Sequence, residues 1–192
     1  MRHPPASAGL DPATRNWLLQ PARTAIQAHF ARQTPPPPEH TPPNAEQLRG
    51  CFVTIHTLPG ELRGCIGTFE ADLPLWRQVD EMAVAAATRD PRFVPLQPDE
   101  LDQCVLEISA LTPRVPAELK DIRVGEHGIW VQKGPHRGVL LPQVATTYAW
   151  DKETFLKQTC IKAGLAADAW RDGSVKIDVF KAEVFMEAER LQ

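Results

Sequence analysis

The chain has 192 residues, is 43% hydrophobic, and carries 21 Lys and Arg against 24 Asp and Glu, a formal charge of −3. This length and apolar content suit one domain, or one domain with a small inserted lobe, and exclude a disordered chain. The acidic balance disfavours general binding to nucleic acid or to anionic membranes.

A search for targeting segments and the spacing of the cysteines indicate the cellular compartment to expect and the kinds of site to exclude. No apolar run approaches the ~20 residues of a membrane-spanning helix, and the N-terminus lacks the apolar region of a secretory signal. The sequence contains four cysteines, at Cys51, Cys65, Cys104 and Cys160. They form no Cys-x-x-Cys pair, and their spacing is typical of neither a zinc site nor a disulfide framework. We therefore expect a cytoplasmic protein with reduced thiols, without a membrane segment, metal site or cofactor.

The N-terminal part predicts a helix followed by a proline-rich spacer. Asp11-Pro12 is a typical helix start, and apolar residues then recur at helical spacing as far as Phe30, with Pro21 expected to kink or divide the helix. Residues 34–43 contain six prolines. We interpret them as a stiff polyproline spacer, with a ligand for an SH3-type domain as the alternative.

A hairpin and a second helix are expected next. Residues 50–56 read as a strand, Pro59-Gly60 as a turn and residues 63–69 as the returning strand. Residues 73–88 predict a helix capped by Asp72 and ended by Asp90-Pro91.

The remaining elements complete a mixed pattern. We expect a strand over 105–111, a hairpin over 128–133 and 138–141, a helix from Asp151 to Gly164, and a last strand or strand pair over 175–186. Because strands and helices mix without a βαβ repeat, the sequence favours an α+β fold with a mainly antiparallel sheet flanked by helices.

Five motifs, taken in order, resemble the AMMECR domain family, which includes AmmeMemoRadiSam system protein A. They are residues 62–68 (LRGCIGT), 90–93 (DPRF), 107–109 (EIS), 140–145 (LLPQVA) and 160–165 (CIKAGL). The resemblance implies a large lobe containing both termini plus a smaller inserted lobe. It also implies Memo-like and radical SAM proteins as partners. We accordingly expect a tail over 1–14 and a single two-lobed domain over 15–190 that includes the 34–43 spacer, which is not part of the family pattern.

The glycine-framed Cys65 is the strongest candidate for chemistry. A symmetric turn at Pro59-Gly60 would place His56 opposite Arg63 and Thr54 opposite Cys65, so that His56 becomes a diagonal neighbour of the thiol on one sheet face. An imidazole can take a thiol proton, and a nearby cation lowers a thiol pKa. A register slip would move His56 to the other face, and the simplest alternative is a buried, inert cysteine.

Other polar residues of the motifs are candidate ligand contacts. Arg63 and Arg92, with Arg89, are candidates for an anion-binding rim, whereas Asp90 is expected to form a salt bridge or helix cap. Glu107 either points outward or pairs with an arginine of the same cleft. Gln143 is a candidate hydrogen-bonding residue for a ligand, with a core or turn role as the alternative.

Two functional hypotheses follow. In the first, the protein is an enzyme or enzyme component in which Cys65 acts as nucleophile or covalent carrier, assisted by His56 and Arg63, on a small anionic substrate. In the second, the same motif is the contact surface of a non-catalytic binding or adaptor module. Nucleic-acid binding is the least favoured reading, because only scattered arginines and aromatic residues support it.

Overall fold

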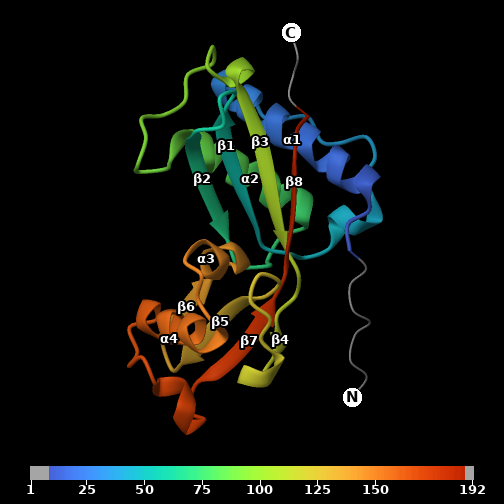
Figure 1. Ribbon diagram of the computed structural model, residues 1–192. Coiled ribbons are helices and arrows are strands. Elements are labelled where there is room, and N and C mark those ends of the chain that lie inside the picture. The colour runs from blue at the N-terminus through green and yellow to red at the C-terminus, as the bar shows by residue number, and fades with distance from the viewer. Residues whose placement is uncertain (1–8, 189–192) are drawn as a thin grey trace. The chain divides into compact units, whose positions relative to one another are not determined.

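A computed structural model describes residues 9–188 of the chain. The described chain consists of two compact units, residues 9–111 with 183–188, and Thr112–Ala182. Both units combine antiparallel strands with helices, so the α+β prediction is confirmed (Figure 1). None of the helices in this described range is long and apolar enough to cross a membrane.

The first unit is a four-stranded sheet covered by two long helices on one face (Figure 1). Along β1, alternate residues are fully buried in the core with the helices, whereas the residues between them are only half buried. This period of two identifies a strand with one core face. The strand order is β2-β1-β3-β8, and the elements are α1 (Pro12–Phe30), β1 (Cys51–Thr57), β2 (Leu62–Thr68), α2 (Leu75–Thr88), β3 (Cys104–Leu111) and β8 (Ala182–Met186).

Helix α1 begins where predicted but continues through its proline. The Asp11 carboxylate accepts hydrogen bonds from the Thr14 amide and hydroxyl, as expected of an N-cap. Pro21 lies inside one continuous helix, so the expected division is wrong. Proline has a helical φ and removes a single hydrogen bond, while Leu18, Ala22 and Ile26 of the same helix are fully buried and hold it in the core.

The expected cap of α2 is also wrong. The N-cap position is occupied by Pro74 rather than Asp72, and no side chain caps the helix. Instead, the Leu75 amide donates to the Gln47 carbonyl at 2.9 Å. A neighbouring chain segment therefore supplies the acceptor that an N-cap side chain would otherwise supply.

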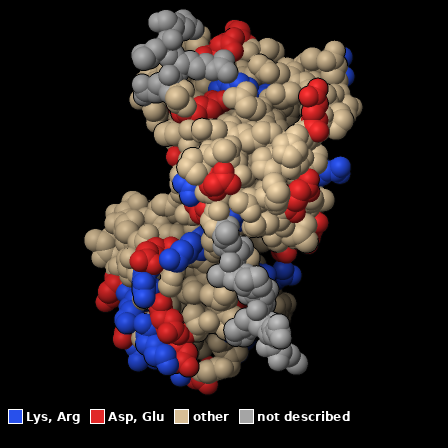
Figure 2. Space-filling view, turned by 90° about the vertical axis from the view of Figure 1, so that its right-hand side faces the viewer, with Lys and Arg blue, Asp and Glu red and all other residues tan. Residues whose placement is uncertain are grey.

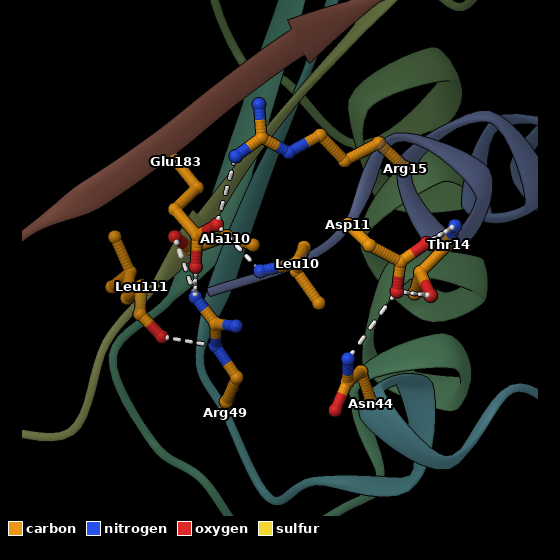
Figure 3. A network of polar contacts seen from close by, with 9 residues as sticks. All are labelled: Leu10, Asp11, Thr14, Arg15, Asn44, Arg49, Ala110, Leu111 and Glu183. Atoms are coloured by element: carbon orange, nitrogen blue, oxygen red, sulfur yellow. Dashed lines mark hydrogen bonds and ion pairs between the residues drawn. The ribbon is translucent and has the colours of Figure 1, made fainter. Parts of the chain in front are cut away.

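An ionic network fixes β8 in the first unit (Figure 3). Glu183 accepts from Arg49 at 2.6 Å, from Arg15 at 3.1 Å and from the Leu10 amide at 2.8 Å. The Arg49 side chain is 1% exposed and also donates to the Leu111 carbonyl. Four residues further on, Glu187 forms a second, bidentate pair with the buried Arg23.

The second unit has its own sheet and its own core. The order is β4-β7-β5-β6, and the elements are β4 (Val115–Pro116), β5 (Gly128–Lys133), β6 (His136–Leu140), α3 (Pro142–Thr147), α4 (Lys152–Lys162) and β7 (Lys176–Phe180). Asp151 caps α4 through the Thr154 amide, and Gly164 follows its end at φ +73°, both as predicted. The expected last strand is a pair, with β7 in this sheet and β8 in the other.

The structure describes only part of the N-terminal tail that is expected over residues 1–14. Residues 1–8 of the expected tail lie outside the described residues, and Pro12–Thr14 already belong to α1. The 34–43 spacer has no regular secondary structure until a 3₁₀ turn begins at Pro43.

Candidate functional site

The β1–β2 hairpin carries the LRGCIGT motif, and its register is largely the predicted one. Thr54 pairs with Cys65 and Phe52 with Gly67, but His56 pairs with Leu62 instead of Arg63. The register shifts between Ile55 and His56, while β1 pairs regularly with β3. Arg63 is thus the extra residue of a β-bulge on β2, which a symmetric hairpin could not anticipate.

A polar row crosses the sheet on the face away from the helices. Thr54 pairs with Cys65 on one side and with Glu107 on the other, and all three are half buried. The Thr54 hydroxyl donates to Cys65 Sγ at 3.3 Å. Residues paired directly across strands share a face, so Cys65, Thr54 and Glu107 lie together there.

His56 lies one step along β1 from this row. It pairs with Val105 of β3 and, two residues from Thr54, shares its face. Its Nε2 is buried and has no hydrogen-bond partner among the described residues. The Cys65 thiol is hydrogen-bonded to the Thr54 hydroxyl. Among the described residues, 9–188, no hydrogen bond joins His56 to the thiol.

The bulge directs Arg63 towards the loop after α2. Its guanidinium forms a bidentate pair with Glu100, at 3.0 and 3.1 Å, and donates to the Val94 carbonyl. Hydrogen bonding from Arg63 lowers the pKa of Glu100. Glu100 lies 37 residues from its partner and in no recognisable motif, so no sequence pattern points to it.

Asp90 and Arg92 together satisfy the backbone of Cys65. The Asp90 carboxylate accepts from the Cys65 amide at 2.8 Å and from the Arg92 side chain at 2.7 and 2.9 Å. Arg92 Nη2 in turn lies 3.4 Å from the Cys65 carbonyl. Hydrogen bonding from Arg92 keeps the pKa of Asp90 well below its usual range. The expected salt bridge of Asp90 is confirmed, and the side chains of Asp90 and Arg92 bond to the outward-facing amide and carbonyl of Cys65 on the edge strand β2.

The two glycines of the motif are required by the fold itself. A Cβ on Gly64 would lie 2.3 Å from the Ala86 carbonyl oxygen of α2, and a Cβ on Gly67 would lie 2.2 Å from the Phe52 ring. The group that approaches the backbone beside Cys65 is thus part of the same unit. The glycines in the sequence indicate that another group comes close to the backbone, but they do not show that Ala86 and Phe52 supply it.

The other candidate residues are distributed over both units. Gln143 lies in the first turn of α3 in the second unit, with an exposed side chain, and its carbonyl accepts from Thr146. Cys51, Cys104 and Cys160 are buried, whereas Cys65 is half buried. No cluster of three or more metal-ligating side chains occurs in the part of the chain that is described.

Surface charge is mixed on the face of the molecule that Figure 2 shows. Lys and Arg side chains alternate with Asp and Glu on the face shown in Figure 2, and its described residues form no extended basic surface. A basic stripe is the usual electrostatic feature of nucleic-acid-binding domains.

Comparison with known proteins places the motifs in a wider group. Residues 19–185 match the AMMECR1 family model. A protein of Thermofilum pendens is 44% identical over 187 residues, covering 88% of each chain. A protein of Methanocaldococcus jannaschii is 45% identical over 159 residues, covering 79% of each chain.

A solved structure agrees with this relationship. The crystal structure of an uncharacterized protein from Pyrococcus horikoshii matches with a TM-score of 0.80 and 37% identity, over 93% of each chain. The resemblance that the five motifs suggest is therefore confirmed by both sequence and structure. The chain belongs to the AMMECR1 family.

Proposed function

We propose that the sheet face around Cys65 is the functional surface of the first unit, and that Cys65 acts there as the nucleophile or covalent carrier of an enzyme or enzyme component. The observation that carries the proposal is a half-buried thiol that shares its sheet face with a histidine two residues from Thr54, the residue paired with Cys65, and the Nε2 of that histidine is buried without a partner among the described residues. Buried polar atoms are rarely left without a partner, and the exceptions call for an explanation. A proton-accepting role for His56 provides one.

The chemistry assigned to this face is nucleophilic substitution. The thiol proton passes to His56 as the sulfur attacks an electrophilic substrate atom, and the leaving group departs with that proton. The Asp90 and Arg92 bonds hold the Cys65 backbone in place for this step. Arg92 keeps 54% of its side chain exposed and is the residue we assign to an anionic substrate group, whereas Arg63 is 14% exposed and paired with Glu100. Glu107 stays as a proposed ligand contact on this face, whereas Gln143 belongs to the second unit.

Alkylation kinetics test the proposal directly. We expect iodoacetamide to modify Cys65 at neutral pH faster than it modifies a free cysteine in an unfolded peptide. Replacing His56 by Gln should slow alkylation of Cys65 near neutral pH at least about fivefold. The matched control is His29→Gln, which changes an exposed histidine of α1, and Cys65→Ser identifies the modified residue.

Two results would contradict this function. One is alkylation of Cys65 no faster than that of a free cysteine in an unfolded peptide. The other is an unchanged alkylation rate in the His56→Gln variant.

A non-catalytic binding module is the second candidate, and specific contacts favour it. Arg63 forms an ion pair with Glu100, and Arg92 forms one with Asp90. The two glycines of the motif allow close packing within the first unit. In this case the sheet face binds a partner, for which the family resemblance proposes Memo-like and radical SAM proteins. Capture of those proteins should then survive Cys65→Ala and fail when Glu107 is replaced by Lys. Loss of capture in both variants, together with fast alkylation of Cys65, would favour the enzyme.

A further inference from the structure

A cavity of about 390 Å³ lies on the helical side of the first unit, beneath the proline-rich segment. It is lined by Asp80 of α2, by residues 35–40 of the proline-rich segment, and by four residues of α1: Trp17, Gln20, Pro21 and Thr24. Its volume is in the range of small-molecule sites, about 300–1,000 Å³. The spacer identified in the sequence is therefore part of a pocket wall.

Asp80 is the unusual residue of this pocket. Its Oδ1 is buried without a hydrogen-bond partner, and the carboxylate has no ion pair among residues 9–188. Arg77, one turn earlier on α2, acts on Asp80 through its charge, but its guanidinium lies over the Trp76 ring, 5.0 Å from the centroid. A carboxylate removed from water without a partner is costly, so such a group is expected to have a counter-ion in its functional state.

The remaining walls define what kind of counter-ion fits. Four consecutive prolines, Pro35–Pro38, and Trp17 offer apolar and aromatic surface next to the Asp80 carboxylate, and Glu39 adds a second carboxylate to the lining. Prolines donate no backbone hydrogen bond, and an indole face attracts cations. No group of three or more metal-ligating side chains occurs among the described residues, so the lining does not suit a metal ion. An apolar stem carrying one positively charged donor group matches all of these surfaces.

We propose that this cavity binds a small primary alkylammonium ion, with Asp80 as its counter-ion. The ammonium donates hydrogen bonds to the carboxylate, and the alkyl stem lies against Trp17 and the prolines. The charged or titratable groups around Asp80 are Arg77 and Glu81 on α2, together with Glu39 and His40 from the proline-rich segment. The side chains that line the cavity from α1 are not ionisable. The inference does not depend on the chemistry proposed for Cys65, which lies on the other face of the sheet.

Calorimetric titration of the full chain with n-pentylammonium tests the proposal. We expect a dissociation constant of about 1 mM, as befits a ligand of a few heavy atoms. Asp80→Asn, which keeps the side chain's shape, should weaken binding at least about tenfold. The matched control is Glu81→Gln, because Glu81 is the next residue on the same helix and is exposed; it should leave the affinity within about twofold.

A neutral ligand and the number of protons released on binding provide two further tests. Neutral 1-pentanol should bind at least about tenfold more weakly than pentylammonium, because it cannot neutralise the carboxylate. Burial raises the pKa of Asp80 to about 7, so binding near pH 6 should release protons that Asp80→Asn does not release.

Three outcomes would overturn the proposal. They are equal affinity of the wild-type and Asp80→Asn proteins, equal affinity for pentanol and pentylammonium, and tighter binding of lysine blocked at both its α-amino and carboxyl groups. The last result would assign the cavity to a lysine side chain of another protein instead of a free amine.

Discussion

Asp80 illustrates how one residue can cost stability at a site that serves another purpose. Burial raises the pKa of this carboxyl from 3.8 to about 7, and nearby Glu81 contributes in the same direction. Between these two pH values the folded protein holds a proton that the unfolded chain has released. The contribution of Asp80 to the free energy of unfolding therefore falls as pH rises through this window.

Asp80→Asn should accordingly stabilise the ligand-free protein above about pH 7 and have no effect below about pH 4. Because the side chain is half buried, we expect a gain on the order of 1–3 kcal/mol, below the full value that the pKa difference implies. Urea unfolding at several pH values measures it. Glu81→Gln is the control, and a gain that is independent of pH would contradict the electrostatic explanation.

Individual residues also show what the sequence could and could not predict. Asp11 and Asp151 cap their helices as expected, because an N-cap is a contact over three residues. The pairing of Arg63 with Glu100, and of Asp90 with the Cys65 amide, joins residues 37 and 25 positions apart. No local pattern encodes such partners, although the motifs draw attention to positions 63, 65 and 90.

At the level of elements, strand β2 is fixed by contacts on both of its edges and on the face towards helix α2. It pairs with β1 on one edge, and the DPR motif bonds to its other edge. Gly64 lets the Ala86 carbonyl of α2 come within the space that a side chain would fill. The predicted hairpin register is correct from Phe52 to Ile55 and fails where Arg63 adds a residue. Bulges depend on such tertiary contacts and have weak sequence signals.

Gly64→Ala should destabilise the first unit by about 1–3 kcal/mol, because the added methyl group meets backbone and not a movable side chain. Chemical denaturation of the purified variant provides the measurement. Gly134→Ala is the comparison: its Cβ meets nothing within 4 Å, but φ is +58°, so a loss near 1 kcal/mol is expected there. A smaller loss for Gly64→Ala than for Gly134→Ala would show that α2 can move away at little cost.

For the whole molecule, the ordering of units along the chain has an energetic consequence. The first unit begins the chain, the second interrupts it after Leu111, and the first resumes at Glu183. The returning strand is joined to the first unit by Glu183 and Glu187, which pair with the buried Arg49 and Arg23. The sequence predicted a last strand or a strand pair over residues 175–186 but not a division between two sheets, because the contacts that bind β8 to the first sheet are ionic and distant in sequence.

Glu183→Gln should therefore destabilise the first unit more than an ordinary surface substitution. It leaves the Arg49 charge, 1% exposed, without its counter-ion, and loss of one partner of a buried pair costs about 3–5 kcal/mol. Hydrogen exchange should show faster opening of β1, β3 and β8, with β5 to β7 less affected. The matched control is Glu153→Gln, whose partner Arg171 is exposed and whose loss should cost less than about 1 kcal/mol.

The same pair gives a pH dependence with a defined sign. Burial raises the pKa of Glu183, but the hydrogen bonds from Arg49 and the Leu10 amide outweigh it, so the pKa is lowered overall. The pair's contribution is then complete above the unfolded pKa of about 4.3 and disappears as pH falls through the lower folded value. Wild-type and Glu183→Gln proteins should converge in stability on acidification. A difference that stays constant down to about pH 2 would assign the loss to packing instead of charge.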